Sequence, residues 1–186
     1  HAPGTFDCEY GFSCMGYEIG GAWGAAMAHT GGDVVSFVGD GSYLMSNSDV
    51  YSSVLSGHKM ILILCDNGGY AVIQRLQEFK GGVPFNNRYE QGTRRASDFE
   101  VDFAAHAASM GAHVERVEDL EGLAGAFQRA RAADRTAVIV IRTDPYTWTG
   151  GDAWWDVGVP EVSEREEVRV AHAQHEAERK RQRIGV

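Results

Sequence analysis

Two stretches of sequence decide the fold: Gly39-Asp40-Gly41-Ser42, and Met60-Ile61-Leu62-Ile63-Leu64-Cys65 with the turn Asp66-Asn67-Gly68-Gly69 that follows it. The apolar run of the second stretch is typical of a strand buried on both faces of a parallel sheet. The first stretch also follows a short apolar run, 33–38, so both runs end in a glycine-rich polar turn. Ligands of doubly wound sheets bind at the carboxyl ends of the strands, so we expect these two turns to share one ligand.

Outward from these stretches, the chain alternates between helix-like and strand-like segments. Apolar strands separated by helices predict an α/β fold, a doubly wound parallel sheet with helices on both faces. Ser97-Asp98-Phe99-Glu100 resembles a capping box and is expected to open one helix. The predicted strands are 33–38, 59–65, 113–117 and 137–142; the predicted helices are 16–29, 46–55, 71–79, 97–110, 120–133 and 163–183, with a loop over 80–96.

The composition of the 186 residues excludes several classes of protein. A net charge of −9 disfavours binding to nucleic acid, which depends on Lys and Arg, and to an anionic membrane surface. The longest apolar run, Met60 to Cys65, is far shorter than the roughly 20 residues of a transmembrane helix. Three cysteines without a Cys-x-x-Cys pair indicate a protein of the reducing cytoplasm.

The two turns carry oxygen ligands suited to a metal ion. Asp40 offers a carboxylate oxygen, Asn67 an amide oxygen, and a nearby glycine a carbonyl oxygen. Such a set suits Mg²⁺ or Ca²⁺ rather than zinc. No arginine lies between residues 39 and 69, so a phosphate group would need a bridging cation there. Gly41 and Ser42 would offer backbone N–H groups to that phosphate.

Other phosphate-binding and nucleophile motifs are missing. A dinucleotide-binding motif needs a third glycine where Leu44 stands, and no Gly-Lys-Ser/Thr tripeptide is present. The segment from Gly11 to Met15 lacks the last glycine of a Gly-x-Ser-x-Gly elbow. The paired turns are therefore the strongest candidate site.

Gly-Asp-Gly-Ser followed by an asparagine 27 positions after Asp40 resembles the thiamine diphosphate motif. On this motif the chain resembles the C-terminal, diphosphate-binding domain of the acetolactate synthase superfamily. The resemblance implies thiamine diphosphate and Mg²⁺ as cofactors, with the metal held by Asp40, Asn67 and the Gly69 carbonyl. It further implies that the aminopyrimidine is gripped by Ser13, Cys14 and Met15, and that the cofactor contacts Gly39, Gly41, Ser42 and Tyr70 as well.

Within that superfamily, residues 9–19, 39–45 and 154–163 are similar to hydrolases of inositol catabolism. The resemblance implies hydrolytic cleavage of a C–C bond in a cyclic diketone, which opens the ring to a deoxy sugar acid. Trp154, Trp155 and Arg88 are the residues proposed to approach this substrate. The paired tryptophans could equally tie the C-terminal tail to the core.

The resemblance also implies partners. In this superfamily a glutamate of a separate pyrimidine-binding domain, usually on a neighbouring subunit, activates the cofactor. We therefore assign no catalytic residue on this chain and expect a homodimer or homotetramer. Residues 1–160 are expected to form the cofactor domain, lacking its first strand, and 161–186 a charged helix. The N-terminal and middle domains are expected to lie outside this chain, which alone should turn nothing over.

Two alternatives remain at this point. The chain could serve a 2-oxoacid decarboxylase or an acetolactate synthase-like enzyme, or be a separate diphosphate-binding subunit of one. It could also be a regulatory module that binds a nucleotide or phosphate with Mg²⁺ and has no catalytic role.

Overall fold

The computed structural model describes residues 4–9, 12, 14–28, 31–92, 99–147 and 158–182. Within this part of the chain, four parallel strands form one sheet in the order β1-β2-β4-β3. The strands are β1 (Val35–Gly39), β2 (Ile61–Asp66), β3 (His113–Val117) and β4 (Ala137–Arg142). The predicted parallel α/β sheet is confirmed, with each strand close to the apolar run that predicted it.

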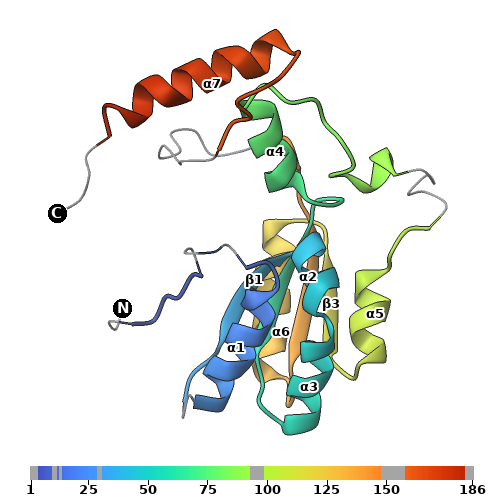
Figure 1. Ribbon diagram of the computed structural model, residues 1–186. Helices are drawn as coiled ribbons and strands as arrows, with labels where there is room; N and C mark the ends of the chain where they lie inside the picture. The colour runs from blue at the N-terminus through green and yellow to red at the C-terminus, as the bar shows by residue number, and fades with distance from the viewer. Residues whose placement is uncertain are drawn as a thin grey trace.

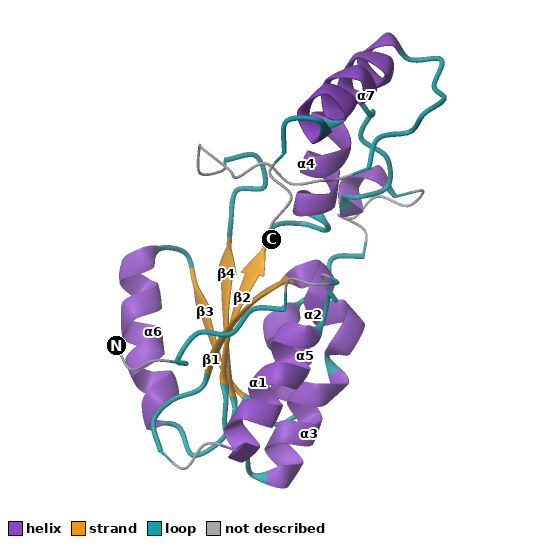
Figure 2. Ribbon diagram, turned by 60° about the vertical axis from the view of Figure 1, so that its left-hand side comes forward, coloured by secondary structure: helices purple, strands orange, loops and turns teal. Residues whose placement is uncertain are grey.

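Helices cover both faces of the sheet, as predicted (Figure 2). On one face lie α1 (Tyr17–Ala28), α2 (Asp40–Ser46), α3 (Ser48–Ser56) and α5 (Phe103–Ser109), and on the other lies α6 (Leu120–Ala132). The buried side chains of the first face gather around Tyr43, Leu62 and Val138. Those of the second face gather around Ile63, Ala126 and Ile139. Each face thus has its own apolar core.

Two helices lie beyond the carboxyl ends of the strands (Figure 1). They are α4 (Ala71–Phe79) and α7 (Glu166–Arg179). The start of α7 packs on the end of α4, because Arg165 donates to the Gly81 carbonyl at 3.2 Å and Val168 is buried. A Cβ at Gly81 would come within 2.5 Å of the Glu167 backbone, so this contact requires glycine. Within the described residues, no helix is both long and apolar enough to cross a membrane.

One edge of the sheet is less covered than the rest. The helix α6 packs on β3 and β4. On β1, the side chains of Val35 and Phe37 are exposed, Phe37 to 65%. An open cavity of about 310 Å³ lies between these side chains and Phe127 of α6.

The structure corrects two predicted helix boundaries. The Gly-Asp-Gly turn is instead the start of α2, which begins at Asp40 directly after β1. Glycine lowers helix propensity, but the buried Tyr43 side chain fixes this helix on the core, and an acidic residue in its first turn is favourable.

The prediction that a helix begins at a capping box at Ser97 is also wrong. Phe99 and Glu100 are not helical, and α5 begins at Phe103; Ser97 and Asp98 lie outside the described residues. The Asp102 carboxylate caps this helix by accepting from the Ala105 N–H at 2.9 Å. It also pairs with Arg116 of β3 at 2.5 Å. The local cap by Asp102 and the burial of Phe103 in the core favour the later start. The short loop helix η1 (Tyr89–Gln91) was not predicted either.

A buried hydroxyl pair gives a test of the first core. The Thr136 hydroxyl lies 2.8 Å from that of Ser53, and the Met60 N–H donates to it at 3.3 Å. Thr136→Val leaves both partners buried without this contact, so we expect the free energy of unfolding to fall by about 1–3 kcal/mol. Urea denaturation measures this change.

Ser109→Ala is the matched control, because its hydroxyl is exposed and bonds only within α5. We expect that substitution to change stability by no more than about 0.5 kcal/mol. Equal losses in the two variants would contradict the importance of the buried pair.

Candidate functional site

The centre of the site is the Asp40 carboxylate, which is completely buried. Asp40 opens α2 at the carboxyl end of β1, and the parallel register places Gly39 opposite Cys65 of β2. The turn after β2 therefore comes back beside Asp40. Its backbone donates to the carboxylate from Gly69 N at 2.7 Å and from Asn67 N at 3.4 Å.

Burial raises the pKa of Asp40 above its ordinary value, and the nearby negative charge of Asp66 adds to this rise. The two backbone N–H groups act in the opposite direction, because they favour the charged form. Burial also raises the pKa of Tyr89, and the nearby Asp40 carboxylate raises it further. A buried carboxylate in this setting calls for a cation or a proton.

The Asn67 amide meets Gly69 and Asp40 at this point. One terminal atom of the amide lies 2.9 Å from the Gly69 carbonyl oxygen and 3.2 Å from an Asp40 carboxylate oxygen, so with the amide oxygen on this side three oxygens come together. Neighbouring ligands of an octahedral Mg²⁺ ion, each about 2.1 Å from the metal, lie about 3 Å apart. The three oxygens therefore fit a small divalent cation. Rotating the amide by 180° would instead let it donate to both of the other oxygens.

The Gly68-Gly69 turn is held by a loop that is distant in sequence. Gly69 pairs with Arg88 in an antiparallel bridge, Tyr70 N donates to Asn87 O at 2.6 Å, and Tyr89 N donates to Gly68 O at 3.1 Å. Gly69 has φ +136°, and a Cβ there would lie 2.5 Å from Asn87 O. Only glycine suits this position. The sequence did not predict this pairing, since the loop has no periodic pattern.

The predicted phosphate-binding residues surround the same turn. Gly41 and Ser42 form the first turn of α2, where backbone N–H groups have no partner within the helix. A Cβ at Gly41 would come within 2.6 Å of the Tyr70 ring, so this ring lies directly against the start of α2. Gly39 caps the helix in an extended conformation. Gly39, Gly41, Ser42 and Tyr70 thus lie together with Asp40.

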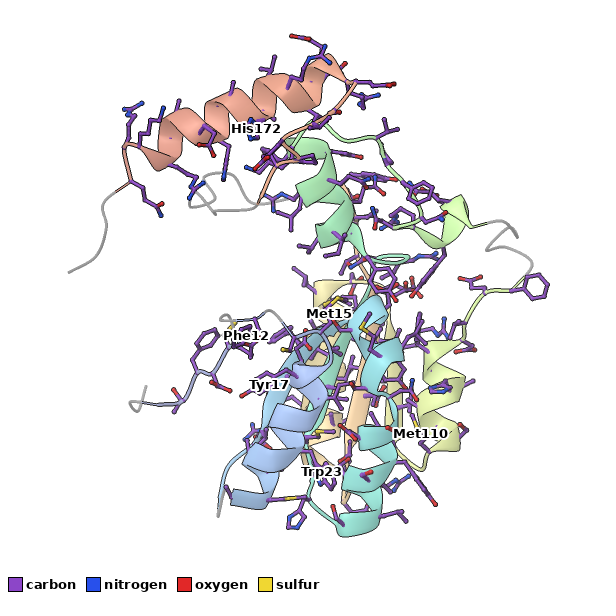
Figure 3. The ribbon with its side chains drawn as sticks, in the orientation of Figure 1. Phe12, Met15, Tyr17, Trp23, Met110 and His172 are labelled. Carbon is purple, nitrogen blue, oxygen red and sulfur yellow. The ribbon has the colours of Figure 1, made fainter. Side chains whose placement is uncertain are left out.

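The segment before α1 approaches the site from another side. Figure 3 shows Met15 at the start of α1, close to α2. Gly16 has φ +96° and packs against the side chain of Ser46 at the end of α2. Cys14 is exposed, and its N–H donates to the Glu9 carboxylate at 2.7 Å. Ser13 lies outside the described residues, so the predicted grip on the aminopyrimidine stays a prediction.

Of the three predicted substrate residues, the structure describes one. Arg88 is 8% exposed, and its guanidinium lies against Gly68, since a Cβ there would be 2.9 Å from Nη2. Arg88 therefore belongs to the site by position. Trp154 and Trp155 lie outside the described residues. The described residues hold no group of three or more His, Cys, Asp or Glu side chains that could hold a metal ion.

Comparisons with known proteins bear on this geometry. Residues 1–141 match the family model "Thiamine pyrophosphate enzyme, C-terminal TPP binding domain", thiamine pyrophosphate being another name for thiamine diphosphate. The chain is 40% identical over 177 residues to 3D-(3,5/4)-trihydroxycyclohexane-1,2-dione hydrolase 2 of Bacillus cereus, and 38% identical over 184 residues to the Listeria monocytogenes hydrolase of that name. These matches cover 91% and 98% of the chain but only 27% and 28% of the relatives.

Solved structures with the same fold include enzymes described as thiamine diphosphate-dependent. The 4-hydroxybenzoylformate decarboxylase of Rhodococcus jostii superposes with a TM-score of 0.61 at 24% identity, over 70% of this chain and 23% of that one. The benzoylformate decarboxylase of Polynucleobacter necessarius gives 0.62 at 23% identity, over 72% and 24%. At this identity the likeness concerns the fold alone. With the family match, it means that the chain belongs to the thiamine pyrophosphate enzymes and carries their C-terminal cofactor-binding domain.

Proposed function

We propose that this chain is the diphosphate-binding part of a thiamine diphosphate- and Mg²⁺-dependent hydrolase that opens the ring of a cyclic 1,2-diketone. The observation that carries the proposal is the meeting of the Asp40 carboxylate, the Asn67 amide and the Gly69 carbonyl at the carboxyl edge of the sheet. The identity of about 40% to named trihydroxycyclohexane-dione hydrolases supports the choice of substrate. The chain spans about 27% of their length, so the reaction belongs to a longer protein.

In this proposal Asp40, Asn67 and the Gly69 carbonyl hold Mg²⁺, which neutralises the charge of the diphosphate. Asp40 offers a carboxylate oxygen with a single negative charge, and Asn67 and Gly69 offer neutral carbonyl oxygens. Mg²⁺ prefers oxygen ligands of these types. The buried Asp40 carboxylate is stabilised as an anion by the metal, so it stays a ligand and moves no proton. Gly41 and Ser42 direct backbone N–H groups at the phosphate oxygens.

The remaining residues position the organic part of the cofactor and the substrate. Ser13, Cys14 and Met15 hold the aminopyrimidine, and Tyr70 lines the cofactor beside Gly41. When bound, thiamine diphosphate supplies a carbon nucleophile and an electron sink for C–C cleavage next to a carbonyl. Arg88, Trp154 and Trp155 are the residues assigned to contact the diketone in this proposal. The activating glutamate comes from the pyrimidine-binding domain of a neighbouring subunit, within a homodimer or homotetramer.

Gly69→Ala tests whether the turn holds the cofactor. A side chain at φ +136° and 2.5 Å from Asn87 O would displace the Gly69 carbonyl. We expect the affinity for thiamine diphosphate in the presence of Mg²⁺ to fall at least tenfold, as measured by calorimetric titration of the full-length protein. Gly24→Ala is the control, because a Cβ there meets nothing within 4 Å. Unchanged affinity in Gly69→Ala would contradict the assigned ligand.

Product analysis tests the reaction itself. The full-length protein, given both cofactors and trihydroxycyclohexane-1,2-dione, should release an open-chain deoxy sugar acid that NMR identifies. Pyruvate should be neither decarboxylated nor condensed to acetolactate. Turnover of pyruvate without ring opening would instead assign the chain to a 2-oxoacid decarboxylase or an acetolactate synthase-like enzyme. Binding of diphosphate analogues that lack the thiazolium, at full affinity and without turnover, would indicate a regulatory module.

A further inference from the structure

Arg88 is a buried cation, two of whose nitrogens have no hydrogen-bond acceptor among the described residues. Its side chain is 92% buried, as its exposed fraction is 8%. Both Nε and Nη1 are buried and have no hydrogen-bond partner within the described residues. Arginine stays charged at every physiological pH, so this charge cannot be removed by losing a proton.

Other arginines of the chain show the usual arrangement. Arg129 bonds the Glu115 carboxylate through two nitrogens, and Arg131 pairs with Asp33 at 2.6 Å. These side chains are half exposed, yet each has a carboxylate partner. Arg88 is far more buried, and its Nε and Nη1 atoms have no carboxylate partner within the described residues. Buried charges are normally paired, because an unpaired one costs desolvation free energy with no compensation.

The position of Arg88 relates this charge to the cofactor turn. Its backbone forms the bridge with Gly69, and its guanidinium lies against the Cα of Gly68. A side chain at Gly68 would push the guanidinium away, as the Cβ would lie 2.9 Å from Nη2. The pairing of the two segments thus fixes a cation immediately beside the proposed diphosphate site.

An aromatic contact does not replace the missing acceptor. The Tyr146 ring lies under the guanidinium, with the Arg88 Cζ 5.6 Å from the ring centroid. A ring face attracts the positive charge, but the N–H groups point outward in the guanidinium plane and still need oxygen atoms. The Tyr146 side chain is 56% exposed, so this ring lies at the surface above Arg88.

We propose that Arg88 is an anion-binding residue of this site, whose guanidinium takes the negatively charged oxygens of a phosphate or carboxylate group. This inference rests on the proposed function, because that function supplies two such anions: the cofactor diphosphate and the carboxylate formed on ring opening. It revises the role expected from the sequence, in which Arg88 contacted substrate hydroxyls. Charge-assisted bonds from arginine to either anion are stronger than bonds to a hydroxyl.

Anion binding by Arg88→Met in the full-length protein tests the proposal. The probes are inorganic pyrophosphate with Mg²⁺, thiamine diphosphate with Mg²⁺, and D-gluconate as an open-chain sugar acid. If Arg88 binds a phosphate group, the dissociation constants of pyrophosphate and thiamine diphosphate rise at least tenfold in the variant, while that of D-gluconate is unchanged. If Arg88 binds a carboxylate group, only the dissociation constant of D-gluconate rises at least tenfold. Changes below twofold for all three probes would overturn the proposal.

Arg142→Met is the matched control, since it removes the same charge from the same edge of the sheet. Its side chain is 73% exposed and lies 3.8 Å from Glu100, so we expect changes below twofold. Arg88→Lys keeps the charge on a compact ammonium and should show an intermediate loss. An equal loss in Arg142→Met would assign the effect to general electrostatics and overturn the specific role of Arg88.

Thermal unfolding separates anion binding from a structural role. Without any anion, Arg88→Met should melt no lower than the parent, because it removes an uncompensated buried charge. The bound anion should raise the melting temperature of the parent and not that of the variant. An Arg88→Met protein that unfolds without anion would show that the guanidinium is structural. A parent that binds these anions through Arg88 but opens no diketone would refute only the proposed function.

Discussion

A single buried carboxylate joins the two turns on which the site depends. Asp40 stands at the end of β1, and its oxygens accept the N–H groups of Asn67 and Gly69 from the turn after β2. These bonds offset only part of the free energy that burying the charge requires, which is why the pKa of Asp40 is raised. A divalent cation between Asp40, Asn67 and Gly69 would compensate the rest. The fold therefore leaves the Asp40 carboxylate in need of a cation or a proton.

Each layer of the structure contributes to that arrangement. Parallel pairing of β1 with β2 brings the two turns to one edge, and the core contacts of Tyr43 hold α2 in place directly after Asp40. The loop around Arg88 then holds the Gly68-Gly69 turn through its bridge to Gly69. The same loop places the buried, positively charged side chain of Arg88 beside this turn. The proposed metal ligands, the backbone donors of α2 and an arginine thus surround a site suited to an anionic ligand bound through a cation.

The sequence predicted those parts of the molecule that depend on local pattern. Apolar runs predicted the strands, and the spacing of Asp40 and Asn67 predicted that they would meet, because both follow neighbouring strands. It could not predict features that depend on distant contacts. Gly-Asp-Gly is a poor helix sequence, and the packing of Tyr43 overrides this. The start of α5 depends on the packing of Phe103 in the core, and the burial of Arg88 depends on a bridge between separate segments.

Anomalous diffraction from Mn²⁺, in crystals of the full-length protein with thiamine diphosphate, tests the central claim most directly. We expect one anomalous peak within about 2.5 Å of the Asp40 carboxylate, the Asn67 side-chain oxygen and the Gly69 carbonyl oxygen. The Asn67 amide should then present its oxygen to the metal. Bound cofactor with no peak at these three atoms, and with the Asn67 amide turned to donate to Asp40 and Gly69, would contradict the account.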